Sequence, residues 1–185
     1  RLNGEDLGVY HAIPHWSKAF ADRNGFGELA NIFGTIDLQP NELAGKNFFN
    51  PTELSYWEDY TRNADINPED FAHLQNFLTF IHHAPPDVYA RALPVYIDMD
   101  SLYAWLVINT LAGSTHQSAI NNIILLRNPA TGRFQPIPWD TQLYAYQPID
   151  IAAHPLVGRT LAIPAYRAEY LRRLEEYVSD EKNLE

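Results

Sequence analysis

The stretch of the chain that decides its fold is residues 98–140, which read DMDSLYAWLVINTLAGSTHQSAINNIILLRNPATGRFQPIPWD. Its first part is apolar almost all round and predicts a central, buried helix that starts around Asp98–Ser101 and ends at Gly113, a candidate C-cap. Its second part places two runs of strand-forming residues around Asn128–Gly132, which predicts a β-hairpin with a five-residue loop.

Helices are predicted on both sides of this central stretch. Asn67 and Pro68 are typical of a helix N-terminus, and the apolar face that follows them should end before Pro85. Pro164 begins a last helix, in which tyrosines and leucines recur at helical spacing as far as Tyr177. The chain is therefore expected to be mainly helical around one hairpin.

The N-terminal third is less regular. Asn3-Gly4 is a hairpin turn signal, and the strand-formers after it predict one strand. Residues 17–23 predict a short helix. Residues 33–63 are broken repeatedly by glycine and proline, which indicates a long loop or insert with at most a short helix near residues 52–60.

Composition excludes several classes of protein. With 46% hydrophobic and 19% charged residues, the 185 residues are expected to fold as one domain. The net charge of −10 argues against a nucleic-acid binder, which neutralises phosphates with clustered Lys and Arg. No apolar run is long enough for a membrane span, and the absence of cysteine excludes disulfides and thiolate metal sites. A first residue of Arg1, without a signal-peptide pattern, predicts a processed protein or a fragment.

The polar residues around the hairpin follow the order of a protein-kinase metal site. Asn122 stands at the start of the first predicted strand and Asp140 follows the second, as do the two metal-binding residues of the kinase template. The template places its general base five residues before the Asn, and that position is Gln117 here. His116 is an alternative base, since an imidazole titrates near neutrality. Asn122 and Asp140 could instead cap the loop and the turn.

Histidines and tryptophans suggest two further kinds of site. A zinc site would need a third ligand that converges with His11 and His15, or with His82-His83. Trp16, Trp57, Trp105 and Trp139 could form a platform for a carbohydrate or a nucleotide. Packing in the core or at its rim explains large aromatic residues more simply, above all for Trp105.

Several segments together resemble the CotH kinase family, the spore coat protein H-like atypical protein kinases. Residues 3–10 look like the family's hairpin that leads into the nucleotide hinge, and residues 98–113 look like its helix and loop. Residues 122–140 look like its metal-site hairpin, and residues 155–170 resemble its closing helix pair. The resemblance covers nearly the whole chain and is weakest over residues 34–65.

The resemblance implies an α+β fold, a mainly helical, protein-kinase-like C-lobe with a β-hairpin at the metal site and a residual N-terminal hinge strand. It divides the single domain into a hinge region (1–33), a variable insert (34–66) and a helical C-lobe (67–185) that contains the hairpin at 122–140. The family's N-lobe, with its phosphate-anchoring Lys, would precede Arg1 and is missing from this sequence.

The resemblance also implies a reaction, transfer of the γ-phosphoryl group of ATP to Ser or Thr of a surface or coat protein. Asn122 and Asp140 would then hold Mg²⁺ or Mn²⁺, and Gln117 would occupy the position of the family's catalytic Asp, beside His116. Nucleotide-binding residues would come from the hinge, namely Val9, Tyr10 and Ile13. The expected location is extracellular or at a cell or spore surface, without a membrane span or nucleic acid; the oligomeric state is not predicted.

Three departures from the family remove a carboxylate. The family usually has Asp at the positions of Gln117 and Gln142 and Glu at the position of Pro14. A neutral amide cannot take up a proton as a carboxylate does, and loss of the base alone should cost roughly 10²–10⁴ in rate. The alternative function is therefore a catalytically inactive pseudokinase, or a structural surface or coat module without cofactor.

Overall fold

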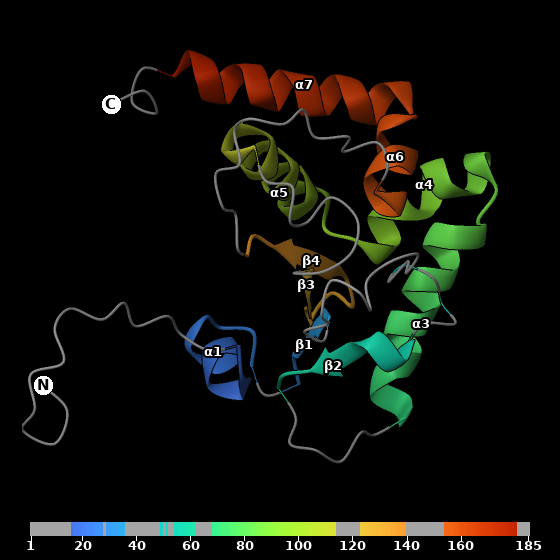
Figure 1. Cartoon of the computed structure of the whole chain (residues 1–185), viewed down its shortest axis with the longest axis vertical. Helices are drawn as coiled ribbons and strands as arrows, with labels where there is room; N and C mark the ends of the chain where they lie inside the picture. Colours follow the sequence, from blue (N-terminus) through green and yellow to red (C-terminus); the bar gives the residue numbers. More distant parts are fainter. Residues whose placement is uncertain are drawn as a thin grey trace, which may run out of the picture.

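The computed structural model describes two thirds of the chain, in six main stretches and two single residues. These are residues 16–27, 29–35, 49, 51, 54–61, 68–113, 123–139 and 154–180. Within them, helices surround a four-stranded antiparallel sheet, so the fold is α+β and dominated by helix, as predicted (Figure 1).

The described elements follow one another in this order: α1 (Lys18–Arg23), β1 (Asn31–Thr35), the 3-10 helix η1 (Leu54–Tyr56), β2 (Trp57–Asp59), α3 (Pro68–His83), α4 (Pro86–Tyr96), α5 (Met99–Ala112), β3 (Ile124–Arg127), β4 (Phe134–Ile137), α6 (Pro155–Leu161) and α7 (Pro164–Ser179). The strands lie in the order β2-β1-β3-β4. Pro136 fits this order, because β4 is an edge strand and a proline cannot donate to a second neighbour.

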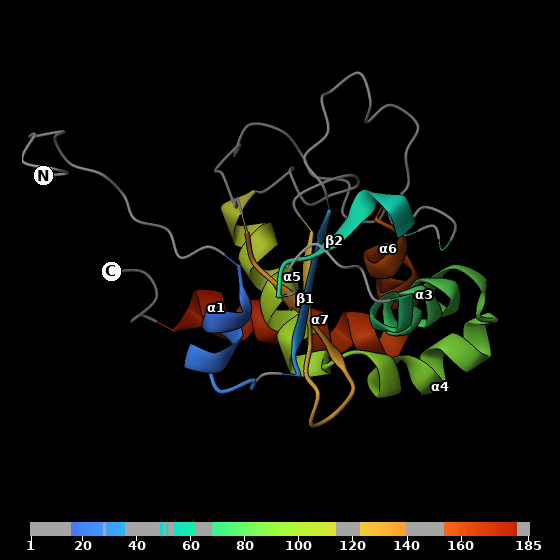
Figure 2. The ribbon, with the colours of Figure 1, turned by 90° about the horizontal axis from the view of Figure 1, so that it is seen from below.

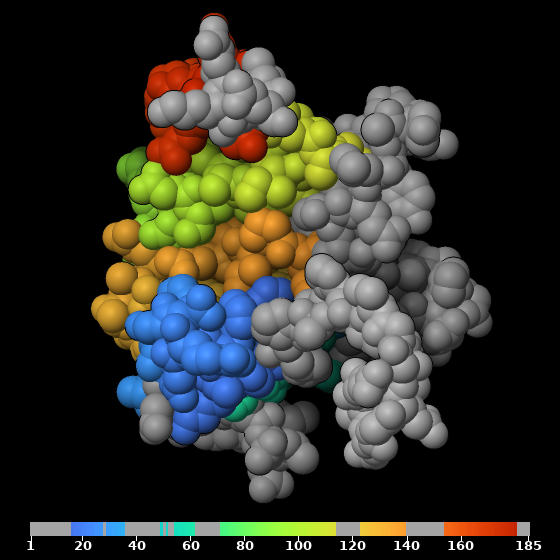
Figure 3. Space-filling model, turned by 90° about the vertical axis from the view of Figure 1, so that its left-hand side faces the viewer, coloured from blue at the N-terminus to red at the C-terminus, as the bar shows by residue number. Residues whose placement is uncertain are grey.

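The sheet separates two hydrophobic clusters. Since successive side chains of a strand point to opposite faces, Phe33 and Leu125 join the large cluster with α3, α4 and α5, whereas Ile32 and Leu126 join a small cluster with α1. Figure 2 shows α1 on one side of β1 and α3 on the other. On the face that carries α1, the hairpin and α5 lie between α1 and α7 (Figure 3).

Most of the locally encoded predictions are confirmed. Ser17 caps α1, and Asp98 caps α5 by accepting a hydrogen bond from the Ser101 N–H at 2.9 Å. Gly113 ends α5 in the left-handed conformation, with φ of 60°, which glycine adopts without steric cost. The β3–β4 hairpin, α3 and α7 lie where the sequence predicts them.

Two predictions about connecting segments are wrong. Residues 33–63 were expected to be loop with at most a short helix near residues 52–60. That short helix is present as η1, but the segment also contributes most of β1 and all of β2, so the hairpin belongs to a larger sheet. The five residues of β1 are all buried and include Gly34, so they lack the alternation that marks a half-buried strand. Helix α4 also follows Pro85 directly, where only a helix end was predicted.

Other predictions fall outside the described residues. The hinge strand at residues 7–10 is one of them, and the division at residues 33 and 66 stays a prediction. Within the described part of the chain, no helix is both long and apolar enough to cross a membrane.

A column of aromatic rings joins β4 to α3 and α4. Phe134 stacks on Phe77 at 4.6 Å, Phe77 on Tyr96 at 6.4 Å, Tyr96 on Phe80 at 4.2 Å, and Phe80 on Tyr89 at 5.2 Å, measured between ring centroids. The planes of neighbouring rings differ by 28° or less. The column therefore ties the edge of the sheet to two helices.

Arg159 of α6 covers the far end of this column. Its guanidinium lies 4.3 Å from the centroid of the Tyr89 ring and donates to the carbonyls of Ile81 and Ala84 at the end of α3. Tyr89 shares a hydrogen bond with Thr160 at 3.1 Å, and burial raises the pKa of its phenol to about 12. These contacts fix α6 to α3 and α4.

Gly34 allows a close crossing over β1 and yields a first prediction. A Cβ atom at residue 34 would clash with the ring of Tyr60, whose hydroxyl donates to the Thr35 carbonyl at 3.3 Å. Gly34→Ala is expected to lower the free energy of unfolding by about 1–3 kcal/mol through overpacking. Urea unfolding measures this loss, and the Tyr60→Ala background should remove most of it. An equal loss in both backgrounds would contradict the proposed clash.

Candidate functional site

None of the residues predicted for the phosphotransferase site belongs to the described residues. This holds for the nucleotide-binding, catalytic and metal-binding candidates alike, which are Val9, Tyr10, Ile13, His116, Gln117, Asn122 and Asp140. It also holds for the departures Pro14 and Gln142. Their roles stay predictions, and the structure describes the elements that adjoin them in the chain.

The register of the β3–β4 hairpin places side by side the two strand ends that adjoin the predicted metal ligands in the sequence. Ile124 of β3 pairs with Ile137 of β4, so β3 begins at the end of the hairpin where β4 finishes. Asn122 comes two residues before the first of these, and Asp140 three residues after the second. The described residues on either side of the predicted ligands therefore lie at one end of the hairpin, and the kinase template has its two metal-binding residues at such an end.

Both flanks are held in place by neighbouring elements. The carbonyl of Ile123 accepts a hydrogen bond from the Thr35 N–H at 3.3 Å, which ties the start of β3 to β1. Trp139 packs edge-to-face on Trp16, with ring centroids 5.4 Å apart, and Trp16 packs in the same way on Phe20 of α1. The end of β4 is therefore anchored to α1, which explains Trp16 and Trp139 as packing residues.

Helix α5 connects the hairpin to the loop of the predicted general base. The Asp98 N–H donates to the Phe134 carbonyl at 2.8 Å, which fixes the start of α5 on β4. The helix then runs through the buried Trp105 and Asn109 to Gly113, four residues before Gln117. Burial of Trp105 confirms that its role is packing. Helix α5 hence leads from the sheet towards the segment of the sequence that carries His116 and Gln117.

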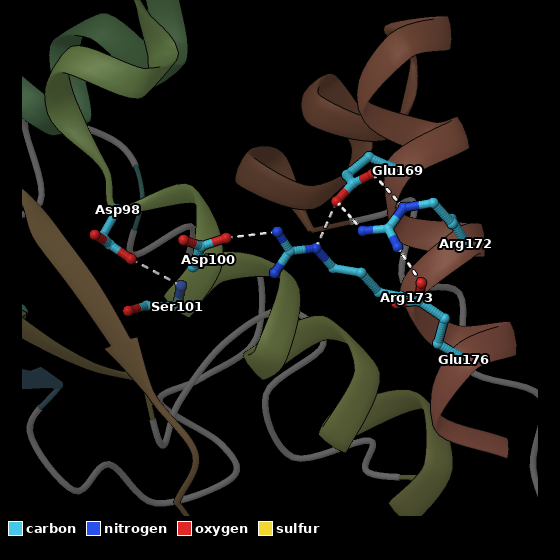
Figure 4. A network of polar contacts seen from close by, with 7 residues as sticks. All are labelled: Asp98, Asp100, Ser101, Glu169, Arg172, Arg173 and Glu176. Carbon is cyan, nitrogen blue, oxygen red and sulfur yellow. Dashed lines mark hydrogen bonds and ion pairs between the residues drawn. The ribbon is translucent and has the colours of Figure 1, made fainter. Parts of the chain in front are cut away.

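The described carboxylates near α5 take part in structural ion pairs (Figure 4). Arg173 of α7 donates to Asp100 of α5 and to Glu169, and its guanidinium lies 4.8 Å from the Tyr103 ring centroid. Hydrogen bonds from Arg172 and Arg173 lower the pKa of Glu169 to about 2. The Asp100–Arg173 pair joins α5 to α7, whereas Glu169 pairs within α7, and the two acids do not form a cluster that points to metal chemistry.

No alternative metal centre emerges in the part of the chain that the structure describes. Its residues contain no group of three or more His, Asp or Glu side chains that could share an ion. His82 and His83 lie with ring centroids 5.2 Å apart, but a third described ligand does not join them. Asn122 and Asp140 lie outside the described residues and stay predicted ligands of a divalent ion.

Sequence reasoning missed an open groove of about 680 Å³ between α3, α4 and the hairpin loop. Aromatic and polar side chains together line it: His73, Asn76, Thr79, Phe80, His83, Ala84, Val95, Tyr96, Thr131, Gly132 and Phe134. Polar residues that recur at helical spacing along α3 were the only sequence pattern that could have indicated one wall of this groove. Because α4 was not predicted, the sequence did not suggest the opposite wall. The groove lies at the loop end of the hairpin, away from the predicted metal end.

Comparison with known proteins agrees with the resemblance seen in the motifs. The family model described as "CotH kinase protein" matches residues 1–183 of this chain. The chain is also similar to the protein named "Inner spore coat protein H" of Bacillus subtilis (strain 168), with 24% identity over 140 residues. That match covers 76% of this chain but 38% of the relative, so the chain spans well under half of the relative's length. Since the family model covers nearly every residue, the chain belongs to the CotH kinase protein family.

Proposed function

We propose that this chain forms part of an ATP-dependent phosphotransferase domain with a protein-kinase-like C-lobe, which phosphorylates Ser or Thr of a coat or surface protein. The observation that carries the proposal is the register of the β3–β4 hairpin, with Ile124 opposite Ile137. This register places the start of β3, which follows Asn122 in the sequence, beside the end of β4, which precedes Asp140. The hairpin itself follows helix α5, which is capped at Asp98. Family membership supports the same assignment.

In this proposal Asp140 and Asn122 would hold a divalent metal ion. The carboxylate of Asp140 and the amide oxygen of Asn122 are hard oxygen ligands, which suit Mg²⁺ and Mn²⁺. A metal ion held there would neutralise charge on the β- and γ-phosphates of ATP and align them with the substrate hydroxyl. Val9, Tyr10 and Ile13 would contact the adenine.

A second candidate function is a pseudokinase that keeps nucleotide or partner binding without efficient transfer. The observation that favours it is the amide at Gln117, where the kinase template has a carboxylate to accept the hydroxyl proton. Gln142, in place of a further acid, would weaken attraction for a divalent ion. In either function, the name of the Bacillus relative supports a partner in a protein coat and a location at a spore or cell surface.

Thermal unfolding of the full parent chain with and without ATP and Mn²⁺ tests the proposal. A ligand at 100 times its dissociation constant stabilises the folded state by about 2.7 kcal/mol, which should raise the Tm by roughly 5–10 °C for a domain of this size. Asp140→Ala is expected to abolish the shift because it removes the proposed metal ligand.

Asp100→Asn provides the matched control. Asp100 is an exposed acid that pairs with Arg173 on α7, so its loss should leave the shift intact. If millimolar ATP and Mn²⁺ do not raise the Tm, the nucleotide site is absent and an interaction module remains. A shift that persists in Asp140→Ala would place the metal on other residues.

A further inference from the structure

His154 is a fully buried ionisable side chain at a junction of three parts of the chain. It is the N-cap of α6 and has a relative exposure of 1%. Its ring packs edge-to-face on Phe49 at 4.6 Å and on Trp105 of α5 at 5.8 Å between centroids. Phe49 in turn contacts Trp57 of β2 at 6.1 Å. A histidine in such aromatic surroundings must be accommodated as an uncharged ring.

The hydrogen bonds of His154 also require the neutral form. Its Nδ1 accepts the N–H of Val157 in the first turn of α6, at 3.4 Å, so Nδ1 cannot carry a proton. The single proton of the neutral imidazole then resides on Nε2, which is buried and has no hydrogen-bond partner among the described residues. A second proton would occupy Nδ1, eliminate the cap of α6 and add an unpaired charge.

The charged side chains on the surrounding elements either bind partners other than His154 or face solvent. Arg159 of α6 donates to carbonyls of α3, and Asp100 of α5 pairs with Arg173. On β2, Glu58 is exposed, while Asp59 accepts hydrogen bonds from Asn31 at 2.8 Å and from Thr61. On α3, His82 and His83 are exposed. No carboxylate of the described residues is therefore positioned to balance a charge on His154.

We propose that His154 is an acid-sensitive latch that holds α6 against α5 and releases its N-terminus when the ring takes up a proton. Release would also loosen α7, which follows α6 directly and packs on α5 through Thr110 and Tyr170, whose hydroxyls lie 2.8 Å apart. The proposal is independent of the nucleotide site, because it concerns how the helix pair docks.

The direction of the pH effect follows from the folded and unfolded states. Burial lowers the pKa of His154 in the folded protein to about 3, from 6.5 for a free imidazole. Above pH 6.5 both states are neutral and stability is unaffected. As the pH falls from 6.5 towards 3, only the unfolded or released state gains the proton, so stability is lost across this window. Between pH 7.5 and 5.0 the unfolding equilibrium constant should rise about 30-fold from this residue alone.

His154→Asn tests the latch without removing the cap. The Asn side-chain oxygen lies where Nδ1 does and is a favoured N-cap, but the residue does not titrate. Urea unfolding of the full chain at pH 7.5 and 5.0 should show a rise in the unfolding constant that is about 30-fold larger for wild type than for His154→Asn. His83→Asn, which removes an exposed histidine of α3, should behave as wild type.

Two further measurements use the wild-type chain and therefore test the latch even if a variant folds poorly. Proton NMR of the wild-type chain should show that the His154 ring stays neutral down to pH 5. Hydrogen exchange at pH 5.0, corrected for the intrinsic pH dependence, should show faster opening of α6 than of α3. Titration of His154 near 6.5, or equal pH dependence in wild type and His154→Asn, would overturn the proposal.

Discussion

Gln117→Asp in the full parent chain is expected to raise the rate of phosphoryl transfer to a Ser- or Thr-containing acceptor by roughly 10²–10⁴-fold. The reason is that a carboxylate can accept the proton of the attacking hydroxyl, whereas the amide of Gln117 cannot. The position matches the base of the kinase template, five residues before Asn122. Transfer of labelled γ-phosphate at saturating ATP and Mn²⁺ measures the gain.

Two companion variants distinguish the effect of a general base on the transfer rate from the effect of an added metal ligand. Gln117→Asn changes the length of the side chain without adding a carboxylate and should leave the rate low. Gln142→Asp should lower the Mn²⁺ concentration needed for half-maximal activity rather than the rate at saturation, because it adds an oxygen ligand with charge. If Gln117→Asp does not accelerate transfer while Asp140 is intact and nucleotide binds, the role assigned to residue 117 is wrong.

Phe77→Ala is expected to lower the free energy of unfolding by about 3–5 kcal/mol, which is a large part of the stability of an ordinary domain. Phe77 is fully buried and stands in the aromatic column between Phe134 of β4 and Tyr96 of α4. Removing its ring leaves a cavity where the sheet edge meets two helices. Urea unfolding followed by far-UV circular dichroism measures the loss.

Phe77→Leu and Tyr177→Ala complete this experiment. Leucine fills most of the space without the stacked geometry, so Phe77→Leu should cost less and can be measured if the alanine variant is unfolded. Tyr177 lies on α7 with a relative exposure of 44%, and its replacement should change stability by about 0.5 kcal/mol or less. A loss below about 1 kcal/mol for Phe77→Ala would show that the column does not support the sheet edge.

Elements whose signals are local in the sequence could be predicted from it. Asp98 and Gly113 cap α5 through contacts within a few residues, and the Asn128–Gly132 loop closes its hairpin in the same way. The order of Asn122 and Asp140 around that hairpin also follows from the sequence, as does the family to which the chain belongs. These features need no distant partner, so a short stretch of residues is sufficient to specify them.

Features that depend on a distant partner were decided only by the tertiary structure. Strand β1 gains its backbone partners from β3, far along the chain, and its Gly34 signals a crossing side chain rather than a break. The buried state of His154 likewise depends on Phe49 and Trp105, which arrive from other segments. Burial and strand pairing are stabilised by residues that meet only after folding, so the pattern around each residue alone does not reveal them.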